Sequence, residues 1–306
     1  MPELPDVELY LAALRTHIAG EKLERVRLAT PFLLRSVDPP IDEAVGRTVT
    51  GVRRIGKRIV WELEGELFLV FHLMIAGRFK WRDRGAVVPR RLGLAAFDFA
   101  AGTLLITEAS TQKRASLHVI RGESTLAAMD PGGLDVLTAG VEAFSRTLQK
   151  ENHTLKRALT DPHLFSGIGN AYSDEILHRA RLSPFRLTRQ LTPDDIRVLH
   201  ASTVDTLTEW TARLLADAGD AFPEKVTAFH DGMAVHGRFG KPCPRCSTPI
   251  QRIVHGEHEV NYCPACQTEG RLLADRALSK LLKDDWPRTL DELERRRQKS
   301  PFLRKA

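Results

Sequence analysis

Cys243-Pro244-Arg245-Cys246 and Cys263-Pro264-Ala265-Cys266 are the stretches that decide the fold of the C-terminal part. They hold the only cysteines of the chain, and sixteen residues separate them. Two such doublets are typical of a four-thiolate tetrahedral site, because each forms a tight turn that presents two sulfurs to one ion. Between them, Ile250–Ile253 and Glu259–Tyr262 are predicted as the strands of a hairpin. The segment is therefore predicted to be a zinc ribbon, with Cys243, Cys246, Cys263 and Cys266 binding one structural zinc.

A pair of disulfides and a bound iron are the alternatives for these cysteines. The sequence shows no signal peptide and no transmembrane run, which favours a reducing compartment and so disfavours disulfides. Iron fits the same ligands. With four thiolates and no open coordination position, the ion is expected to hold the fold and to do no chemistry.

The other end of the chain reads Met1-Pro2-Glu3-Leu4-Pro5-Asp6-Val7-Glu8. Removal of Met1 leaves Pro2 as a free secondary amine, and an α-amino pKa near 8 keeps a useful fraction unprotonated at neutral pH. Such an amine attacks an aldehyde-like carbon to give an iminium ion, and Glu3 is placed to move protons at that carbon. The alternative is that Pro2 is a common residue after the initiator Met and that Glu3 is simply a surface residue.

The composition of the chain indicates how many domains it forms and what kind of partner it binds. The chain has 306 residues, of which 42% are hydrophobic, so it suits two domains with an appendage and can bury real cores. Its net charge of +6 points to a polyanionic partner. Because the chain also carries 39 acidic residues, any nucleic-acid surface is expected to be a local patch.

The order of elements predicts an α+β protein. Pro5–Ile18 is predicted as a helix that ends at Gly20. Short β runs follow, and they indicate a β-sandwich: Leu23–Leu28, Val49–Ile55, Ile59–Leu63, Glu66–His72, Leu92–Phe99 and Thr103–Thr107, with Glu64-Gly65 as a hairpin turn. Helices are predicted at Val141–Leu159, Ala171–His178, Pro193–Ala216 and Leu272–Leu282. The basic tail, Arg295-Arg296-Arg297 through Arg304-Lys305, is expected to be frayed.

A glycine turn precedes the helix at Ala171–His178. Gly167-x-Gly169-Asn170 aims the N–H groups of a helix start outward, an arrangement that can grip a phosphate. The alternative is an ordinary glycine turn before a helix.

In combination, these features resemble the Fpg/Nei family of DNA glycosylases, as a divergent branch. The matching stretches, in the family's order, are Met1–Glu8, Arg53–Leu63, His72–Phe79, Leu164–Glu175 and Val235–Gln267. The resemblance implies a helix and β-sandwich catalytic domain at 1–130 and a helical helix–two-turn–helix DNA-binding domain at 131–238. A zinc ribbon at 239–271 and a C-terminal helix with a basic tail at 272–306 complete the organisation.

The resemblance also implies a bifunctional DNA glycosylase and AP lyase of base excision repair. Pro2 would attack C1′ of a damaged nucleoside as a Schiff-base nucleophile, and Glu3 would protonate the opening sugar. Lys57 would contact phosphate and assist β-elimination; the alternative is a solvated loop lysine. Asn170 and Lys156 would hold backbone phosphate, while the damaged nucleotide is flipped out of the stack.

The sequence differs from the family pattern at two places that bear on strand cleavage and base flipping. The family's fingertip Arg, five residues before the third cysteine, is His258 here, so δ-elimination is uncertain and Arg252 is the candidate to compensate. The loop Thr107–Arg114 lacks the family's Arg and Phe, so Met74-Ile75 is expected to fill the hole left by the flipped base. The alternative for Met74 and Ile75 is two core residues at a strand end.

A third departure concerns substrate. The segment His230–Ala234 is too short for the loop that caps 8-oxoguanine in the family, which favours oxidised pyrimidines or lesions in open or single-stranded DNA. A non-catalytic DNA-damage binding protein and a lyase acting mainly on abasic sites remain as rivals, although a pure binder has no need of Pro2 and Glu3. The expected partner is damaged DNA, with no membrane and no nucleotide cofactor, for a monomer in the cytoplasm that associates with the nucleoid.

Overall fold

The structure is a computed structural model, and it describes residues 1–255, 258–274 and 287–299. The chain divides into two compact units. Unit 1 comprises residues 1–135 and 207–228, and unit 2 comprises residues 136–206 and 229–306. Helix α6 (Pro193–Ala218) contributes residues to both units. None of the helices in the described ranges has the length and apolar character needed to span a membrane.

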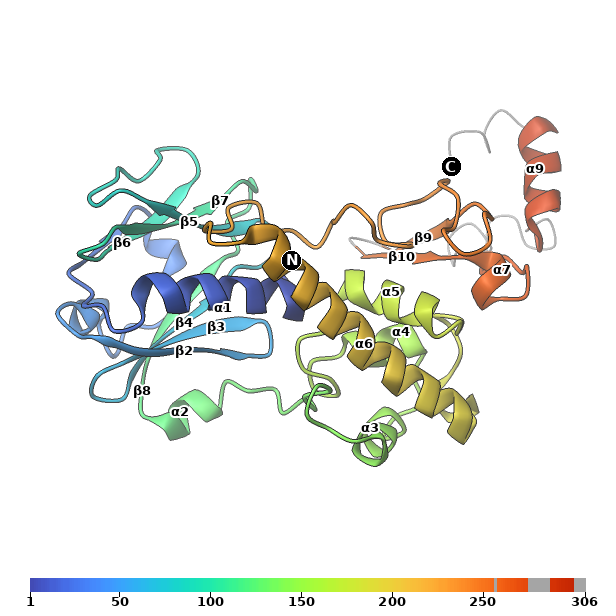
Figure 1. The fold of residues 1–306 in the computed structure, drawn as a ribbon, viewed down its shortest axis with the longest axis horizontal. Helices are drawn as coiled ribbons and strands as arrows, with labels where there is room; N and C mark the ends of the chain where they lie inside the picture. Colours follow the sequence, from blue (N-terminus) through green and yellow to red (C-terminus); the bar gives the residue numbers. More distant parts are fainter. Residues whose placement is uncertain (256–257, 275–286, 300–306) are drawn as a thin grey trace. The chain divides into compact units, whose positions relative to one another are not determined.

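Unit 1 contains two four-stranded antiparallel sheets and helix α1 (Leu4–Ile18), drawn in blue in Figure 1. One sheet has the order β2-β3-β4-β8, formed by Val49–Ile55, Arg58–Leu63, Leu67–His72 and Ser116–Arg121. The other has the order β1-β6-β7-β5, formed by Arg25–Leu28, Gly93–Asp98, Thr103–Glu108 and Gly77–Arg82. Short helices occupy Pro31–Leu33 (η1), Ile41–Ala44 (η2) and Glu123–Ala127 (α2).

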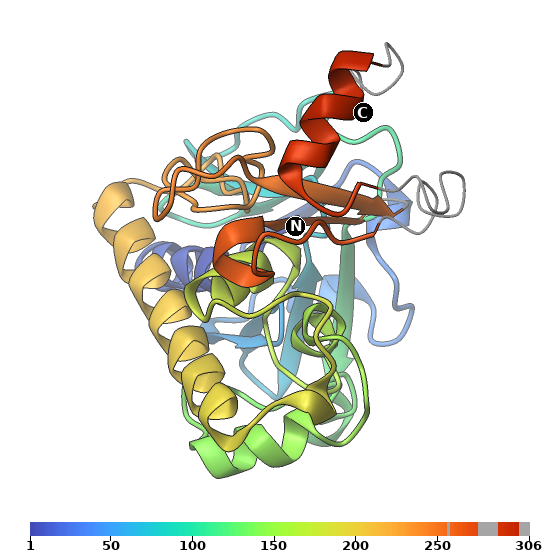
Figure 2. The same ribbon diagram turned by 90° about the vertical axis from the view of Figure 1, so that its right-hand side faces the viewer.

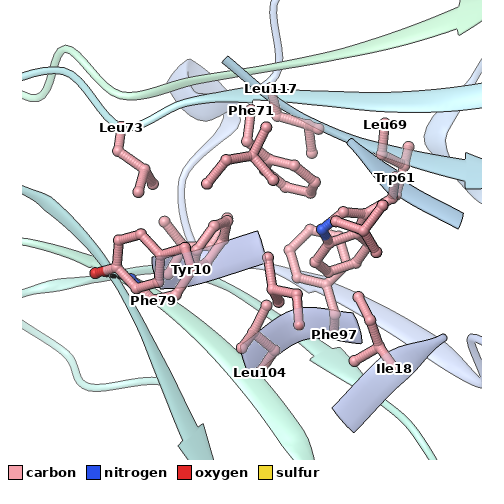
Figure 3. Packing of buried hydrophobic residues seen from close by; sticks show 14 of the residues in the cluster. Tyr10, Ile18, Trp61, Leu69, Phe71, Leu73, Phe79, Phe97, Leu104 and Leu117 are labelled. Carbon is pink, nitrogen blue, oxygen red and sulfur yellow. Dashed lines mark hydrogen bonds between the residues drawn. The ribbon is translucent and has the colours of Figure 1, made fainter. Parts of the chain in front are cut away.

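Aromatic side chains from both sheets and from α1 form the core of unit 1 (Figure 3). Trp61 of β3 lies 4.6 Å from Phe71 and 5.2 Å from Phe97, measured between ring centroids. Tyr10 of α1 packs edge-on against Phe79 at 5.3 Å, and its hydroxyl accepts the backbone N–H of Phe79. This packing fixes α1, and with it the start of the chain, against the sandwich.

The predicted helix and β-sandwich are confirmed, and so is the turn at Glu64-Gly65, where Gly65 has a φ of +74°. Two strands were missed. β5 buries Phe79 on one face but carries Arg78, Lys80 and Arg82 between its apolar residues, and this charge masked its alternating pattern. β8 was missed as well, although Leu117 and Val119 alternate with half-buried residues along it.

Unit 2 begins with four helices and ends with the predicted hairpin. The helices are α3 (Val141–Leu148), α4 (Leu155–Thr160), α5 (Asn170–Arg179) and the first part of α6, with a short η3 at Thr188–Gln190. β9 (Gln251–His255) and β10 (His258–Tyr262) pair antiparallel and are followed by α7 (Pro264–Gln267). Figure 2 shows the hairpin and α7, drawn in orange, in a second view.

The single helix predicted over Val141–Leu159 is wrong. The chain leaves the helix after Leu148 and starts a new one at Leu155. Thr154 begins the second helix, because its hydroxyl accepts the backbone N–H of Arg157 at 3.4 Å.

The C-terminal segment also differs from the prediction. Of the helix predicted at Leu272–Leu282, residues 272–274 are not helical and the remainder lies outside the described residues. The tail predicted as frayed forms α9 (Leu290–Lys299) as far as Lys299, while Arg304 and Lys305 lie outside the described residues. The missed signal is the N-cap Thr289, whose hydroxyl accepts the N–H of Glu292, while the Glu292 carboxylate accepts the N–H of Arg288 before the cap.

Candidate active site and zinc centre

The start of the chain is buried and held in place. Pro2 is buried and Glu3 is 2% exposed, immediately before α1. The backbone N–H of Glu3 donates to the Asp6 carboxylate at 2.8 Å, and the carbonyl of Glu3 accepts the N–H of Val7. The main chain at Pro2 and Glu3 therefore has one defined position.

Burial and four nearby charged groups act on the amine of Met1. Burial lowers the pKa of the Met1 amine below its ordinary value of 8.0; Glu3 and Asp6 oppose this effect, and Arg78 and Lys57 add to it. An amine in this environment is unprotonated at a lower pH than an exposed one, and only the unprotonated form is a nucleophile. The structure thus brings Lys57 and Arg78 within electrostatic reach of the amine at the start of the chain.

Lys57 lies in the turn between β2 and β3, which is made possible by Gly56 with a φ of +58°. His72, at the end of β4, belongs to the same region. Burial lowers the pKa of His72 to about 4, and Arg58, Lys57 and His118 lower it further. His72 is therefore neutral at neutral pH, which makes it a hydrogen-bonding group beside two cations.

Sequence reasoning assigned no role to His72 or Arg78, although both lie in the matched stretch His72–Phe79. A histidine at the end of a buried strand was the available signal for the first. The sequence offered no such signal for Arg78, because strand β5, to which it belongs, was itself missed.

The turn between β4 and β5 presents Ile75 at its apex. Gly77 donates its backbone N–H to the Leu73 carbonyl at 2.9 Å, and a Cβ on Gly77 would lie 2.3 Å from that oxygen. Met74 has a φ of +53° and is half-buried, whereas Ile75 is 55% exposed. Arg78 donates to the carbonyls of Ile75 and Gly77, which fixes the turn. Of the two predicted hole-filling residues, Ile75 is the one that projects.

Glu108 organises the loop that follows β7. Its carboxylate is 1% exposed and accepts the backbone N–H groups of Arg114 at 3.0 Å and of Ala115 at 3.1 Å. Lys113 donates to the Glu108 carbonyl, and the Arg114 guanidinium donates to Gln112. The loop predicted to lack a wedge is thus closed by its own polar contacts.

In unit 2, the glycine turn leads directly into α5. Gly167 has a φ of +81°, and Asn170 is the first residue of the helix and is half-exposed. Lys156 of α4 lies beneath the turn and is 7% exposed. Its ammonium donates to the Asn170 carbonyl at 2.6 Å and to the Asp174 carboxylate at 2.5 Å. Lys156 is thus bound inside the protein, because the buried Asp174 carboxylate requires a countercharge.

The four cysteines lie together, with all four sulfurs within 4.8 Å of one another. The Cys246–Cys263 and Cys243–Cys266 sulfur pairs are 3.4 and 3.9 Å apart. Tetrahedral zinc with bonds of about 2.3 Å separates its sulfurs by about 3.8 Å, so the cluster fits the ion. Burial raises the pKa of Cys266 to about 11, so a divalent cation is needed to hold this thiol as thiolate at neutral pH.

The two residues of the ribbon that were predicted to contact DNA, Arg252 and His258, lie on its strands. Arg252 of β9 stacks on the Phe239 ring at 4.6 Å and lies 3.7 Å from the Glu259 carboxylate. His258 is the first residue of β10 and pairs in register with His255. Gly256 and Glu257, between these two histidines, are outside the described residues.

Comparison with known proteins identifies the family. The chain is 34% identical over 278 residues to a formamidopyrimidine-DNA glycosylase of Thermus thermophilus, covering 88% of this chain and 100% of that protein. The chain belongs to the formamidopyrimidine-DNA glycosylase family. It matches the family's N-terminal domain at residues 1–121, its H2TH (helix–two-turn–helix) domain at 133–213, and the zinc finger found in FPG and IleRS at 240–268.

Solved structures agree with this family. The MutM (Fpg) protein of Thermus thermophilus matches with a TM-score of 0.72 and 32% identity, covering 87% of this chain and 98% of that one. Lactococcus lactis Fpg in complex with DNA containing an abasic site matches with a TM-score of 0.77 and 25% identity, covering 87% and 99%. The chain is thus a DNA N-glycosylase with AP lyase activity, a DNA-binding enzyme of base excision repair, and it carries one structural zinc.

Proposed function

We propose that the chain removes oxidised bases through a Schiff base on Pro2 and then cleaves the strand by β-elimination. In this mechanism the amine of Pro2, freed by removal of Met1, attacks C1′ and the damaged base departs. Glu3 protonates the sugar as its ring opens. The observation that carries the proposal is the environment at the start of the chain, where burial, Arg78 and Lys57 lower the pKa of the Met1 amine, next to Pro2.

Lys57 serves the second step. The iminium ion withdraws electrons from C2′, and loss of a C2′ proton expels the 3′ phosphate. A cation in the Gly56-Lys57 turn stabilises the departing phosphate and assists the proton transfer. His72, neutral and next to Lys57, is a hydrogen-bond donor for the same phosphate.

Three regions contact the DNA in this proposal: the turn at Ile75, the start of α5 and the zinc ribbon. Ile75, exposed at the apex of its turn, fills the space left by the flipped nucleotide, and Met74 shapes the turn behind it. Asn170 grips backbone phosphate at the start of α5. Lys156 supports this grip from beneath by holding the Asn170 carbonyl. Arg252 and His258 contribute from the ribbon, and δ-elimination depends on one of them.

Oxidised pyrimidines, or lesions in open or single-stranded DNA, are the preferred substrates in this proposal. Only His230–Ala234 occupies the place of a purine-capping loop, and it forms a tight turn in which Met233 donates to the His230 carbonyl and is 1% exposed. Lactococcus lactis Fpg, 25% identical to this chain, has been solved with DNA containing an oxidised pyrimidine, so a relative with this fold accommodates such a lesion.

We further propose four segments: a catalytic domain at 1–130, a helix–two-turn–helix domain at 131–238, a zinc ribbon at 239–271 and a C-terminal extension at 272–306. The bounds of the family models, 1–121, 133–213 and 240–268, support this division. In the same proposal the protein acts as a monomer on damaged DNA, without a nucleotide cofactor or a membrane, in the cytoplasm and at the nucleoid.

Borohydride trapping on a panel of oligonucleotides tests the proposal. Each duplex or single strand carries one oxidised pyrimidine, 8-oxoguanine or an abasic site. A covalent adduct with oxidised pyrimidines, absent in Pro2→Gly, is expected. Trapping on abasic sites alone would favour the abasic-site lyase, and binding without trapping would favour the non-catalytic damage-binding protein.

A further inference from the structure

Helix α5 buries an unusual number of polar side chains on the side that meets the zinc ribbon. Asp174, Glu175 and His178 are only 1%, 6% and 4% exposed in a helix of ten residues. Burying such groups is costly unless each one is hydrogen-bonded. All three have their partners in the segment that leads into the ribbon or in the ribbon itself, and Figure 1 shows β10 beside α5.

His178 reaches a zinc ligand directly. Its Nε2 lies 3.3 Å from the Cys243 sulfur. A zinc-bound thiolate can only accept hydrogen bonds, so Nε2 carries the proton and donates it. The backbone N–H of Arg245 donates to the same sulfur at 3.4 Å, and the Arg245 guanidinium donates to the His178 carbonyl at 3.2 Å. The first cysteine turn is therefore attached to the last turn of α5.

Glu175 holds the segment immediately before that cysteine turn. Its carboxylate accepts three consecutive backbone N–H groups, from Ala234 at 2.7 Å and from Val235 and His236 at 2.9 Å. These bonds fix the direction in which the chain approaches Cys243.

Asp174 extends the connection to the start of the helix. One carboxylate oxygen accepts from His236 Nδ1 at 2.9 Å and from the backbone of Asn261 in β10 at 3.1 Å. The other accepts from Lys156, whose ammonium also holds the Asn170 carbonyl. A continuous set of polar contacts thus joins the ribbon to the turn at Asn170.

We propose that His178 is a positioning residue of the zinc centre, and that α5 couples zinc binding to the phosphate grip at Asn170. A hydrogen bond to a metal ligand orients that ligand, and loss of such a bond typically costs roughly 10- to 100-fold in metal affinity. Coupling between two sites is reciprocal, so DNA bound at the turn must strengthen zinc binding by the same factor by which zinc strengthens DNA binding. The coupling half of this inference rests on the proposed role of Asn170, whereas the zinc half does not.

Zinc release to a chromogenic chelator tests the role of His178. His178→Phe is expected to release zinc at least roughly 10-fold faster than the wild type, and His178→Gln, whose amide nitrogen replaces Nε2, is expected to restore slow release. His200→Phe is the matched control, because His200 is also in unit 2 but bonds to the Ala139 carbonyl. Equal release from the two Phe variants would overturn the proposal.

Replacing zinc by cobalt adds a spectroscopic measurement that responds to the hydrogen bond on the thiolate and not to side-chain packing alone. The thiolate-to-cobalt charge-transfer band of His178→Phe should shift relative to the wild type, and that of His200→Phe should not. Should His178→Phe not fold, His178→Asn replaces it, since its shorter amide does not reach Cys243 as that of His178→Gln does. Identical bands and release rates for Asn and Gln would then refute the hydrogen bond.

Zinc release in the presence of a non-cleavable abasic-site oligonucleotide tests the coupling. Bound DNA should slow release in the wild type, and Asp174→Asn should reduce this effect. Release that DNA does not change would refute the coupling. A separate DNA titration of Asn170→Ala tests the phosphate grip, and unchanged affinity there would remove that role while leaving the His178 results intact.

Discussion

Lys156 and Asp174 form a buried ion pair, with the ammonium 2.5 Å from a carboxylate oxygen and side-chain exposures of 9% and 0%. Removing one partner of such a pair leaves an uncompensated buried charge, which typically costs about 3–5 kcal/mol. The pair therefore serves the internal structure of the helix–two-turn–helix region more directly than it serves the DNA.

Lys156→Ala should accordingly destabilise the protein by roughly 3–5 kcal/mol in urea unfolding. The slope of log affinity for DNA against log salt should stay near that of the wild type, because no phosphate contact is lost. A small stability loss together with a slope reduced by about 0.9 would instead show that Lys156 neutralises one phosphate.

Met74→Gly should leave stability unchanged or raise it by up to about 1 kcal/mol. The left-handed conformation at Met74 costs a non-glycine residue about 1–2 kcal/mol, and the greater freedom of glycine in the unfolded chain offsets part of the gain. Thermal unfolding measures the change. Ala76→Gly in the same turn is the control, since Ala76 does not adopt a positive φ and should lose stability.

Ile75→Ala should leave the melting temperature within a few degrees of the wild type, because the side chain is 55% exposed. It should slow base excision from duplex DNA more than from single-stranded DNA, since only a duplex has a hole to fill. Single-turnover rates on both substrates provide the comparison, and equal slowing on the two would rule out this role for Ile75.

Glu3→Gln should reduce base release by roughly 100-fold or more, while cleavage of a preformed abasic site changes far less. Glycosidic cleavage requires proton donation to the sugar, whereas the aldehyde of an abasic site is already open to the amine. Parallel assays on the two substrates decide the matter, and equal losses would contradict the assigned division of labour.

Arg78→Ala should move the pH profile of borohydride trapping to higher pH. Arg78 lowers the pKa of the Met1 amine, and we expect the same effect on the Pro2 amine that removal of Met1 exposes. Loss of Arg78 should therefore raise that pKa, so the reactive unprotonated fraction requires a more alkaline solution. Lys80→Ala is the matched control, as a half-buried cation on the same strand. Superimposable profiles for Arg78→Ala and the wild type would show that Arg78 does not act on the amine.

The features that could be predicted from the sequence depend on residues that are close together in the chain. The cysteine doublets and the start of α1 are specified by residues close together in the chain, so both could be read from spacing alone. The ion pair of Lys156 with Asp174, eighteen positions away, could not be predicted, because no local pattern reveals a partner so distant in the chain. His178 was missed for the same reason, since its partner Cys243 is 65 positions further on.

The core of unit 1 includes Leu214 and Val226, and Arg82 of β5 pairs with Glu224. These residues are synthesised after the whole segment 136–206, which belongs to unit 2. On the ribosome, the sandwich therefore cannot complete its core until more than two thirds of the chain has emerged, and a nascent chain that stops near residue 135 would expose apolar surface. Chaperone demand during translation should thus persist well past the last strand of the sandwich.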